Sequence, residues 1–124
     1  MIKGFAHIAL YTDKFEETIS FYENAFDAKN LGYIMTTRRG CWLQIGDSYL
    51  EIFESEALPA EGAFKHLAIE CDSVDAMIEK AISFGATFYQ AARDITLDLD
   101  IPKKLKIAFI KGINGEQIEL VENR

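Results

Sequence analysis

The chain has 124 residues, a length that suits one compact domain or two short modules. Hydrophobic residues make up 49% and charged residues 27%, which is typical of a soluble globular protein with a real core. The net charge of −7 argues against a nucleic-acid-binding surface, because phosphate binding depends on clustered lysines and arginines.

Two further features bear on the environment of the protein. The apolar runs are far shorter than the roughly 20 residues that cross a bilayer, and the first residues lack a signal pattern, so we expect a cytoplasmic protein with no membrane partner. Cys41 and Cys71 are isolated, without CxxC spacing, which favours buried reduced thiols.

Alternation predicts a first strand over residues 5–11, with His7 on the face opposite Ala6, Ile8 and Leu10. Asp13 then predicts a helix start, with Glu16 as its capping-box partner. The helix extends to about Phe26, and its apolar positions fall on one face, which we expect to be buried: Phe15, Ile19, Tyr22 and Phe26.

An extended segment near 31–38, a turn at Arg39-Gly40 and a strand over 41–45 follow, and a turn at 46–48 leads into a strand that contains Glu51. A two-residue hairpin loop would place Trp42 and Gln44 on the Glu51 face, and a three-residue loop would place them on the other. The basic pair Arg38-Arg39, like Lys103, Lys104 and Lys106, is interpreted as solvated, with an anion-binding role as the alternative.

The first strand is repeated later in the chain. Phe5-Ala6-His7-Ile8-Ala9-Leu10 is matched by Phe64-Lys65-His66-Leu67-Ala68-Ile69, and these copies contain the only two histidines. Glu51 and Glu119 likewise occupy matching turn-and-strand segments, 46–54 and 114–122, each between aliphatic neighbours. Two repeated units, about 1–57 and 63–124, therefore each place a histidine and a glutamate on faces not used for packing.

A second helix fits the same repeat. Asp72-Ser73 predicts its start and Gly85 its end, and its apolar positions have helical spacing: Val74, Met77, Ile78, Ala81 and Ile82. The histidine precedes the capping aspartate by six residues in both copies (13 − 7 and 72 − 66). The copies differ at 92–105, which we interpret as an edge strand plus a connection, with a lid or specificity loop as the alternative.

A lone histidine or a strand glutamate is usually an ordinary polar residue, but the matched positions of two of each favour a shared role. His7, Glu51, His66 and Glu119 converging on one point would hold a divalent metal: nickel, zinc, cobalt, manganese or iron. Four protein ligands would leave two octahedral positions for substrate oxygens or water.

With these four residues and its closing 117–122 segment, the chain resembles the vicinal-oxygen-chelate superfamily over nearly its whole length. The resemblance implies an α+β fold of paired βαβββ modules, whose curved mixed sheets enclose a metal site with the helices outside. The four residues match the ligand positions of glyoxalase I (lactoylglutathione lyase), which implies a methylglyoxal-detoxifying lyase.

In such an enzyme a thiol–methylglyoxal hemithioacetal becomes a lactoyl thioester through an enediolate. Glu119, and secondly Glu51, would be the catalytic carboxylates that move the proton. Tyr11 and Ser55 stand where glutathione-using relatives have arginine and asparagine, so the pocket would be more aromatic than charged. Its expected lining is Tyr11, Trp42, Gln44, Tyr49 and Phe53.

Other members of the superfamily supply the alternatives. One is an enzyme like methylmalonyl-CoA epimerase, whose second ligand is typically glutamine where this chain has Glu51. A ring-cleaving dioxygenase would use His7, His66 and Glu119 around iron, and an antibiotic-binding or fosfomycin-modifying resistance protein is a further alternative. The resemblance also implies a homodimer with the site at or near the interface, and a small-molecule substrate.

Overall fold

The computed structural model describes residues 6–56, 66–99 and 101–124. The chain divides into two compact units, Met1–Ala60 and Glu61–Arg124. Phe5, Phe64 and the predicted module ends at 57 and 63 lie outside the described residues.

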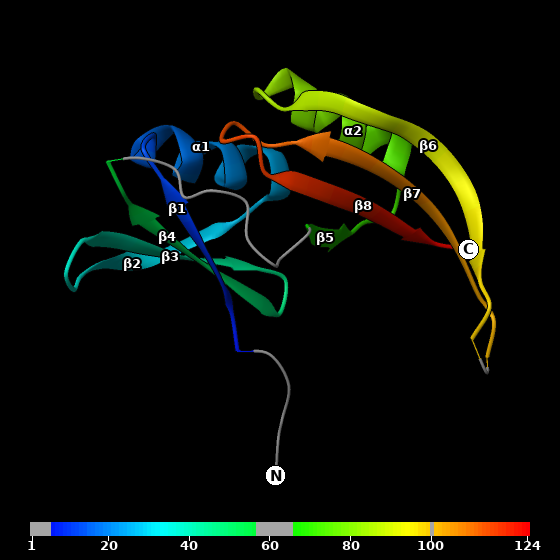
Figure 1. Cartoon of the computed structure of the whole chain (residues 1–124), viewed down its shortest axis with the longest axis horizontal. Coiled ribbons are helices and arrows are strands. Elements are labelled where there is room, and N and C mark those ends of the chain that lie inside the picture. Colours follow the sequence, from blue (N-terminus) through cyan, green and yellow to red (C-terminus); the bar gives the residue numbers. More distant parts are fainter. Residues whose placement is uncertain (1–5, 57–65, 100) are drawn as a thin grey trace, which may run out of the picture. The chain divides into compact units, whose positions relative to one another are not determined.

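The first unit consists of one sheet and one helix (Figure 1). Its sheet has the strand order β1-β4-β3-β2; β1 and β4 are parallel, and the other neighbours are antiparallel. In chain order the elements are β1 Ile8–Thr12, α1 Phe15–Phe26, β2 Lys29–Met35, β3 Arg39–Ile45 and β4 Ser48–Glu54.

The second unit repeats this topology. Its sheet has the order β5-β8-β7-β6, and again only the pair that contains the first strand, β5 and β8, is parallel. The elements are β5 Leu67–Glu70, α2 Val74–Ser83, β6 Thr87–Leu97, β7 Lys103–Lys111 and β8 Gln117–Asn123. The predicted α+β fold of two βαβββ modules with mixed sheets is thereby confirmed.

The first core lies between α1 and one face of its sheet. The four predicted positions Phe15, Ile19, Tyr22 and Phe26 are all buried. They pack on the sheet face that contains the buried side chains Leu43, Leu50 and Ile52. Each such burial stabilises the fold by about 1.5–3 kcal/mol. Because side chains alternate along a strand, Glu51 lies on the opposite face.

The start of α1 differs from the prediction. The N-cap is Lys14 rather than Asp13, and no side chain caps it. The Thr12 hydroxyl accepts the Lys14 backbone N–H at 2.8 Å, and the Thr18 hydroxyl donates to the Lys14 carbonyl at 2.6 Å. A threonine at the end of β1 therefore stabilises the entry into the helix, so the proposed Asp13–Glu16 capping box was wrong.

The start of α2 lies in the predicted Asp72-Ser73 segment, but the capping residue is Ser73 rather than the aspartate. The Ser73 hydroxyl accepts the Ala76 N–H as an N-cap, and Gly85 follows the helix at φ 114°, which favours glycine. Lys14 and Ser73 both lie seven residues after a histidine (14 − 7 and 73 − 66). The repeat thus extends to the helix start, one residue later than the matched aspartates indicate.

The two hairpins of the first unit have different loops. The turn between β2 and β3 lies at residues 36–38, where Thr36 N–H donates to the Arg38 carbonyl, so the predicted Arg39-Gly40 turn was wrong and both residues belong to β3. Between β3 and β4 only residues 46 and 47 intervene, and Ile45 pairs with Ser48. This is the two-residue alternative, which puts Trp42 and Gln44 on the Glu51 face.

The segment 92–105 is part of the long hairpin of β6 and β7. The two strands are paired along this segment as far as the pair Leu97–Lys103. Beyond the pairing with β8, this hairpin extends as a two-stranded arm with exposed Leu99 and Ile101 near its tip. Of the two alternatives, the edge strand plus a connection is therefore the correct one for the described residues.

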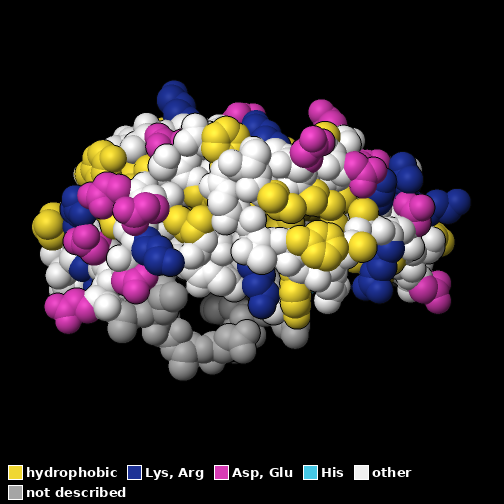
Figure 2. Space-filling view, turned by 90° about the horizontal axis from the view of Figure 1, so that it is seen from above, with side chains coloured by type: hydrophobic (Ala, Val, Ile, Leu, Met, Phe, Trp, Pro, Cys, Tyr) yellow, Lys and Arg dark blue, Asp and Glu magenta, His cyan; other side chains and the backbone are white. Residues whose placement is uncertain are grey.

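The surface in Figure 2 includes apolar side chains (yellow) among charged ones. The exposed large hydrophobic residues of the second unit include Ile82, Phe84 and Phe88. Neither helix in the described part of the chain has the length and apolar character of a membrane span.

Candidate metal-binding and substrate-binding face

The first histidine and glutamate lie together because β1 and β4 are parallel. Ala9 pairs with Glu51, and His7 precedes Ala9 by two residues, so the imidazole lies on the Glu51 side of the sheet. His7 Nε2 is 3.5 Å from Glu51 Oε1, and the two side chains are 37% and 12% exposed. The pair is thus open to solvent at the imidazole.

The second unit builds the same pair at the same register. Ala68 pairs with Glu119, and His66 stands two residues before Ala68. His66 Nε2 is 2.9 Å from Glu119 Oε2, with the side chains 31% and 17% exposed. The repeat in the sequence therefore corresponds to a repeat of side-chain geometry.

Both pairs have the geometry of two neighbouring ligands of one divalent ion. With metal–ligand bonds of about 2.1 Å, two ligand atoms lie about 3.0 Å apart at a right angle and about 3.4 Å apart at a tetrahedral angle. The observed 2.9 and 3.5 Å fall close to these values. Within the described ranges no group of three or more His, Cys, Asp or Glu is placed to hold a metal ion, so the candidate ligands of each unit are limited to its histidine–glutamate pair.

An aromatic ring contacts each histidine. The Trp42 ring lies edge-on to His7 at 4.6 Å between centroids, and the Phe109 ring lies edge-on to His66 at 5.3 Å. Trp42 pairs with Glu51 across β3 and β4, as Phe109 pairs with Glu119 across β7 and β8.

Phe109 was not predicted from the sequence. It precedes its glutamate by ten residues and Trp42 precedes its own by nine, because the turns between the paired strands differ in length. Only the pairing register shows that the two aromatic residues are equivalent.

All five residues that were expected to line the pocket lie on the Glu51 face of the first sheet. Tyr11 pairs with Phe53, their rings being 6.0 Å apart, and Gln44 pairs with Tyr49. Trp42 lies between these two rows, 6.2 Å from the Tyr49 ring. This face is therefore mostly aromatic, as predicted.

Gly40 shapes the end of this face. It pairs with Phe53, and a β-carbon at position 40 would come within 3.1 Å of the Phe53 ring and 3.0 Å of Ile34. Because glycine has no side chain, the Phe53 ring lies across the strand next to Tyr11.

A cation lies over this aromatic end. The Arg38 guanidinium carbon is 4.9 Å from the centre of the Tyr11 ring. In the second unit the Lys111 ammonium lies 4.5 Å from the centre of the Tyr89 ring. Arg38 therefore reaches from the β2–β3 turn onto the Glu51 face, a placement that its interpretation as a solvated loop residue did not include.

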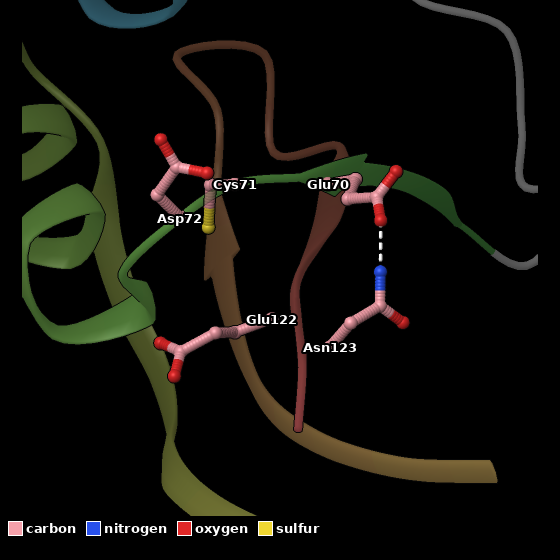
Figure 3. A pocket seen from close by; sticks show the side chains of 5 residues that line it. All are labelled: Glu70, Cys71, Asp72, Glu122 and Asn123. Atoms are coloured by element: carbon pink, nitrogen blue, oxygen red, sulfur yellow. Dashed lines mark hydrogen bonds between the residues drawn. The ribbon is translucent and has the colours of Figure 1, made fainter.

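A pocket at the ends of β5 and β8 is a different feature (Figure 3). Glu70 accepts a hydrogen bond from the Asn123 amide, and Glu122 accepts the backbone N–H of Val74 at 2.8 Å. Both carboxylates are therefore already bound by groups of the second unit itself. Cys71 lies in the same pocket.

Comparisons with known proteins agree with this architecture. A model of the Glyoxalase/Bleomycin resistance protein/Dioxygenase superfamily matches residues 4–99. The fosfomycin resistance protein FosX from Listeria monocytogenes is 20% identical, with a TM-score of 0.80 over 100% of this chain and 94% of that one. FosX from Mesorhizobium loti is 21% identical, with a TM-score of 0.74 over 100% and 94% of the two chains.

A glyoxalase family protein from Enterococcus faecalis is 23% identical, with a TM-score of 0.74 over 98% of both chains. Among curated proteins no match was found. Listeria FosX has been crystallised with manganese(II), which agrees with the expected class of cofactor. The chain belongs to the Glyoxalase/Bleomycin resistance protein/Dioxygenase superfamily, as its sequence resemblance predicts.

Proposed function

We propose that the protein is a divalent-metal-dependent enzyme of the glyoxalase I type, which converts a thiol–methylglyoxal hemithioacetal to a lactoyl thioester. The observation that carries this proposal is the repeated pair of one imidazole and one carboxylate at 3.5 Å in the first unit and 2.9 Å in the second. A ligand set of two histidines and two glutamates distinguishes this activity from those of relatives that need three protein ligands.

In this proposal His7, Glu51, His66 and Glu119 hold the metal. When bound, the metal would supply a positive charge that stabilises the oxyanions formed on the substrate. The edge-on contacts of Trp42 and Phe109 keep the imidazole rings oriented.

A carboxylate performs the proton transfer. Glu119 takes the proton from the hydroxyl-bearing carbon of the hemithioacetal, and the substrate becomes an enediolate. The same carboxylate returns the proton to the neighbouring carbon, and the hydroxyl proton passes to the oxygen on that carbon, so that one C–H and one O–H bond break and one of each forms. Glu51 is the second candidate for this step, because it occupies the equivalent register position in the other unit.

The aromatic face of the first sheet would bind the thiol part of the substrate. Tyr11, Trp42, Tyr49 and Phe53 offer flat apolar surfaces on the same side as Glu51, and Gln44 adds a polar group at one end. Its amide already donates to the Gly46 carbonyl at 3.0 Å, which fixes the orientation of this side chain. Such a surface favours thiols with a small or aromatic body.

A fosfomycin-modifying enzyme is the second candidate. It is supported by the full-length similarity in fold to FosX from Listeria, a mutant of which was crystallised with manganese(II) and 1S,2S-dihydroxypropylphosphonic acid. An epimerase and a dioxygenase are less well supported, because Glu51 would replace an expected glutamine in the first and would crowd the oxygen position in the second. As in other members of the fold, we propose a homodimer with the site at or near its interface.

The test combines metal analysis with an activity assay. Trp42 is the only tryptophan and contacts His7, so quenching of its fluorescence should report binding of nickel, cobalt or manganese near the first pair. Methylglyoxal would be offered with several thiols, and formation of the thioester followed by ultraviolet absorbance. Fosfomycin would be offered in parallel.

The expected result is metal binding together with thioester formation, which a chelator abolishes. Metal binding without thioester formation from any thiol would contradict the proposal. Turnover of fosfomycin in the same preparation would establish the second candidate instead.

A further inference from the structure

We propose that Arg38 recognises an anionic group of the substrate, a carboxylate or a phosphonate, at the end of the aromatic face opposite Gln44. This inference rests on the proposed function for the location of the reaction. It adds a specificity residue, and it makes the preferred substrate one with a negative charge beyond the metal-binding oxygens.

Arg38 makes a cation–π contact with Tyr11. Its guanidinium lies 4.9 Å from the centre of the Tyr11 ring, and Tyr11 in turn packs beside Phe53. Tyr11 pairs with Phe53, two residues beyond Glu51 in the same strand. Tyr11 and Phe53 therefore form the side-chain row next to Glu51, about 7 Å from it along the strand, and the guanidinium lies over the Tyr11 end of that row.

The charge of Arg38 is available for a ligand. Among the residues that the structure describes, no carboxylate forms an ion pair with Arg38. Arg39, the next residue, is bound by two carboxylates: Glu16 at 2.9 Å and Glu54 at 2.8 Å. These partners raise the pKa of Arg39, the hydrogen bond that its guanidinium donates to Glu54 being the largest cause. The two adjacent arginines thus have different roles, one structural and one open to solvent.

The geometry of guanidinium suits this role. It presents several N–H groups in a plane, so that carboxylate and phosphonate oxygens can accept two hydrogen bonds at once. The cation–π contact with Tyr11 keeps the guanidinium near this end of the face before the ligand arrives, which reduces the entropy lost on binding. The net charge of −7 would otherwise repel an anionic substrate, and Arg38 offsets that repulsion locally.

The experiment compares two hemithioacetals of methylglyoxal, one from mercaptoacetate and one from 2-mercaptoethanol, which differ in charge. The readout is the ratio of kcat/KM for the anionic compound to that for the neutral compound, measured in the wild type, Arg38→Ala and Arg39→Ala. Arg38→Ala should lower this ratio by about tenfold or more, the effect typical of a lost hydrogen bond to a charged group. Arg39→Ala should leave it unchanged.

Equilibrium binding of the same compounds, followed by the fluorescence of Trp42, separates this inference from the proposed function. Weaker binding of the anionic compound to Arg38→Ala, without turnover in any variant, would support Arg38 and contradict the proposed reaction. Turnover with a ratio that Arg38→Ala does not change would overturn the role of Arg38 and leave the reaction standing. Failure of the wild type to bind either compound would overturn the role of Arg38 as well.

Discussion

His66 Nε2 lies 2.9 Å from Glu119 Oε2, and the ring of Phe109 contacts that imidazole from the edge. The first unit repeats this arrangement with different residues and a longer distance. In both units a parallel strand pair places the histidine two residues before the partner of the glutamate. The repeated topology thus fixes the geometry of both histidine–glutamate pairs as well as a core.

Removing one carboxylate of the first pair should weaken metal binding. Glu51→Gln keeps the size of the side chain but removes its charge. Loss of a group that only supports a ligand lowers metal affinity by up to about 100-fold, so we expect loss of the ligand itself to lower the affinity for nickel or manganese by more than that. Quenching of Trp42 fluorescence measures this change. Glu54→Gln is the matched control, because Glu54 lies in the same strand and pairs with Arg39. Equal affinities of the two variants would contradict Glu51 as a ligand.

Phe109 should orient the second histidine. Edge-to-face ring pairs contribute about 0.5–1.5 kcal/mol, so Phe109→Ala should weaken metal binding by about 2- to 10-fold while the metal ligands remain. A competition titration with a chelator would measure the difference. Phe88→Ala is the control, since Phe88 is an aromatic residue of the same unit that is 53% exposed. If Phe88→Ala lowered the metal affinity as much as Phe109→Ala does, the effect would not be specific to the ring on His66.

The sequence predicted most of the fold because its signals are local. Alternation around Glu51 predicts that its neighbours are buried, and helical spacing predicts the same for Phe15, Ile19 and Tyr22. These side chains are buried in the structure. The start of α1 was missed because Thr12, a strand residue, bonds to the helix backbone through its side chain, whereas the prediction considered only Asp13.

The surroundings of the candidate site were predicted less completely, because they depend on contacts that are not local in the sequence. His7, Glu51, His66 and Glu119 are visible as a repeat, because each lies in a segment with a matching copy. Phe109 was missed since its relation to Glu119 depends on the pairing register of β7 and β8. The placement of Arg38 over Tyr11 depends on the path of a turn, which no periodicity reports.

The two helix starts should respond differently to substitution. Ser73→Ala removes the hydroxyl that accepts the Ala76 N–H and should lower the free energy of unfolding by about 1 kcal/mol. Asp13→Ala, at the residue that does not cap α1, should change it by less than about 0.5 kcal/mol. Urea denaturation of both variants measures the difference. A larger loss for Asp13→Ala would restore the capping role of that residue.

The buried hydroxyl pair next to α1 should be sensitive as well. Thr12 and Thr18 are fully buried and 3.0 Å apart between hydroxyl oxygens, and Thr12 also accepts the Lys14 N–H. Thr12→Val keeps the shape but removes the acceptor, which should cost about 1–3 kcal/mol of unfolding free energy. Thr37→Val, at an exposed turn position, is the control, and a cost equal to that of Thr12→Val would contradict the importance of the hydroxyl.

The two cysteines should be poorly reactive and should make stability depend on pH. Burial, the largest cause, raises the pKa of both thiols above the ordinary value of 9.0, so the neutral thiol predominates at neutral pH. An alkylating reagent should therefore modify native protein slowly, and Cys71, which is partly exposed, should react before Cys41, which is fully buried. Peptide mapping by mass spectrometry gives the order, and faster reaction of Cys41 would contradict its burial.

The same shift fixes the sign of the pH effect. A thiol whose pKa is higher in the folded state than in the unfolded chain contributes stability that is fully present below the unfolded value. That contribution is lost as the pH rises through the folded value. The free energy of unfolding should consequently decrease above about pH 9, where unfolded thiols begin to ionise. Cys41→Ala removes one of the two thiols and should make this decrease smaller. Urea denaturation at neutral and alkaline pH would measure the decrease in both proteins. An identical decrease in the variant would exclude Cys41 as a source of the pH dependence.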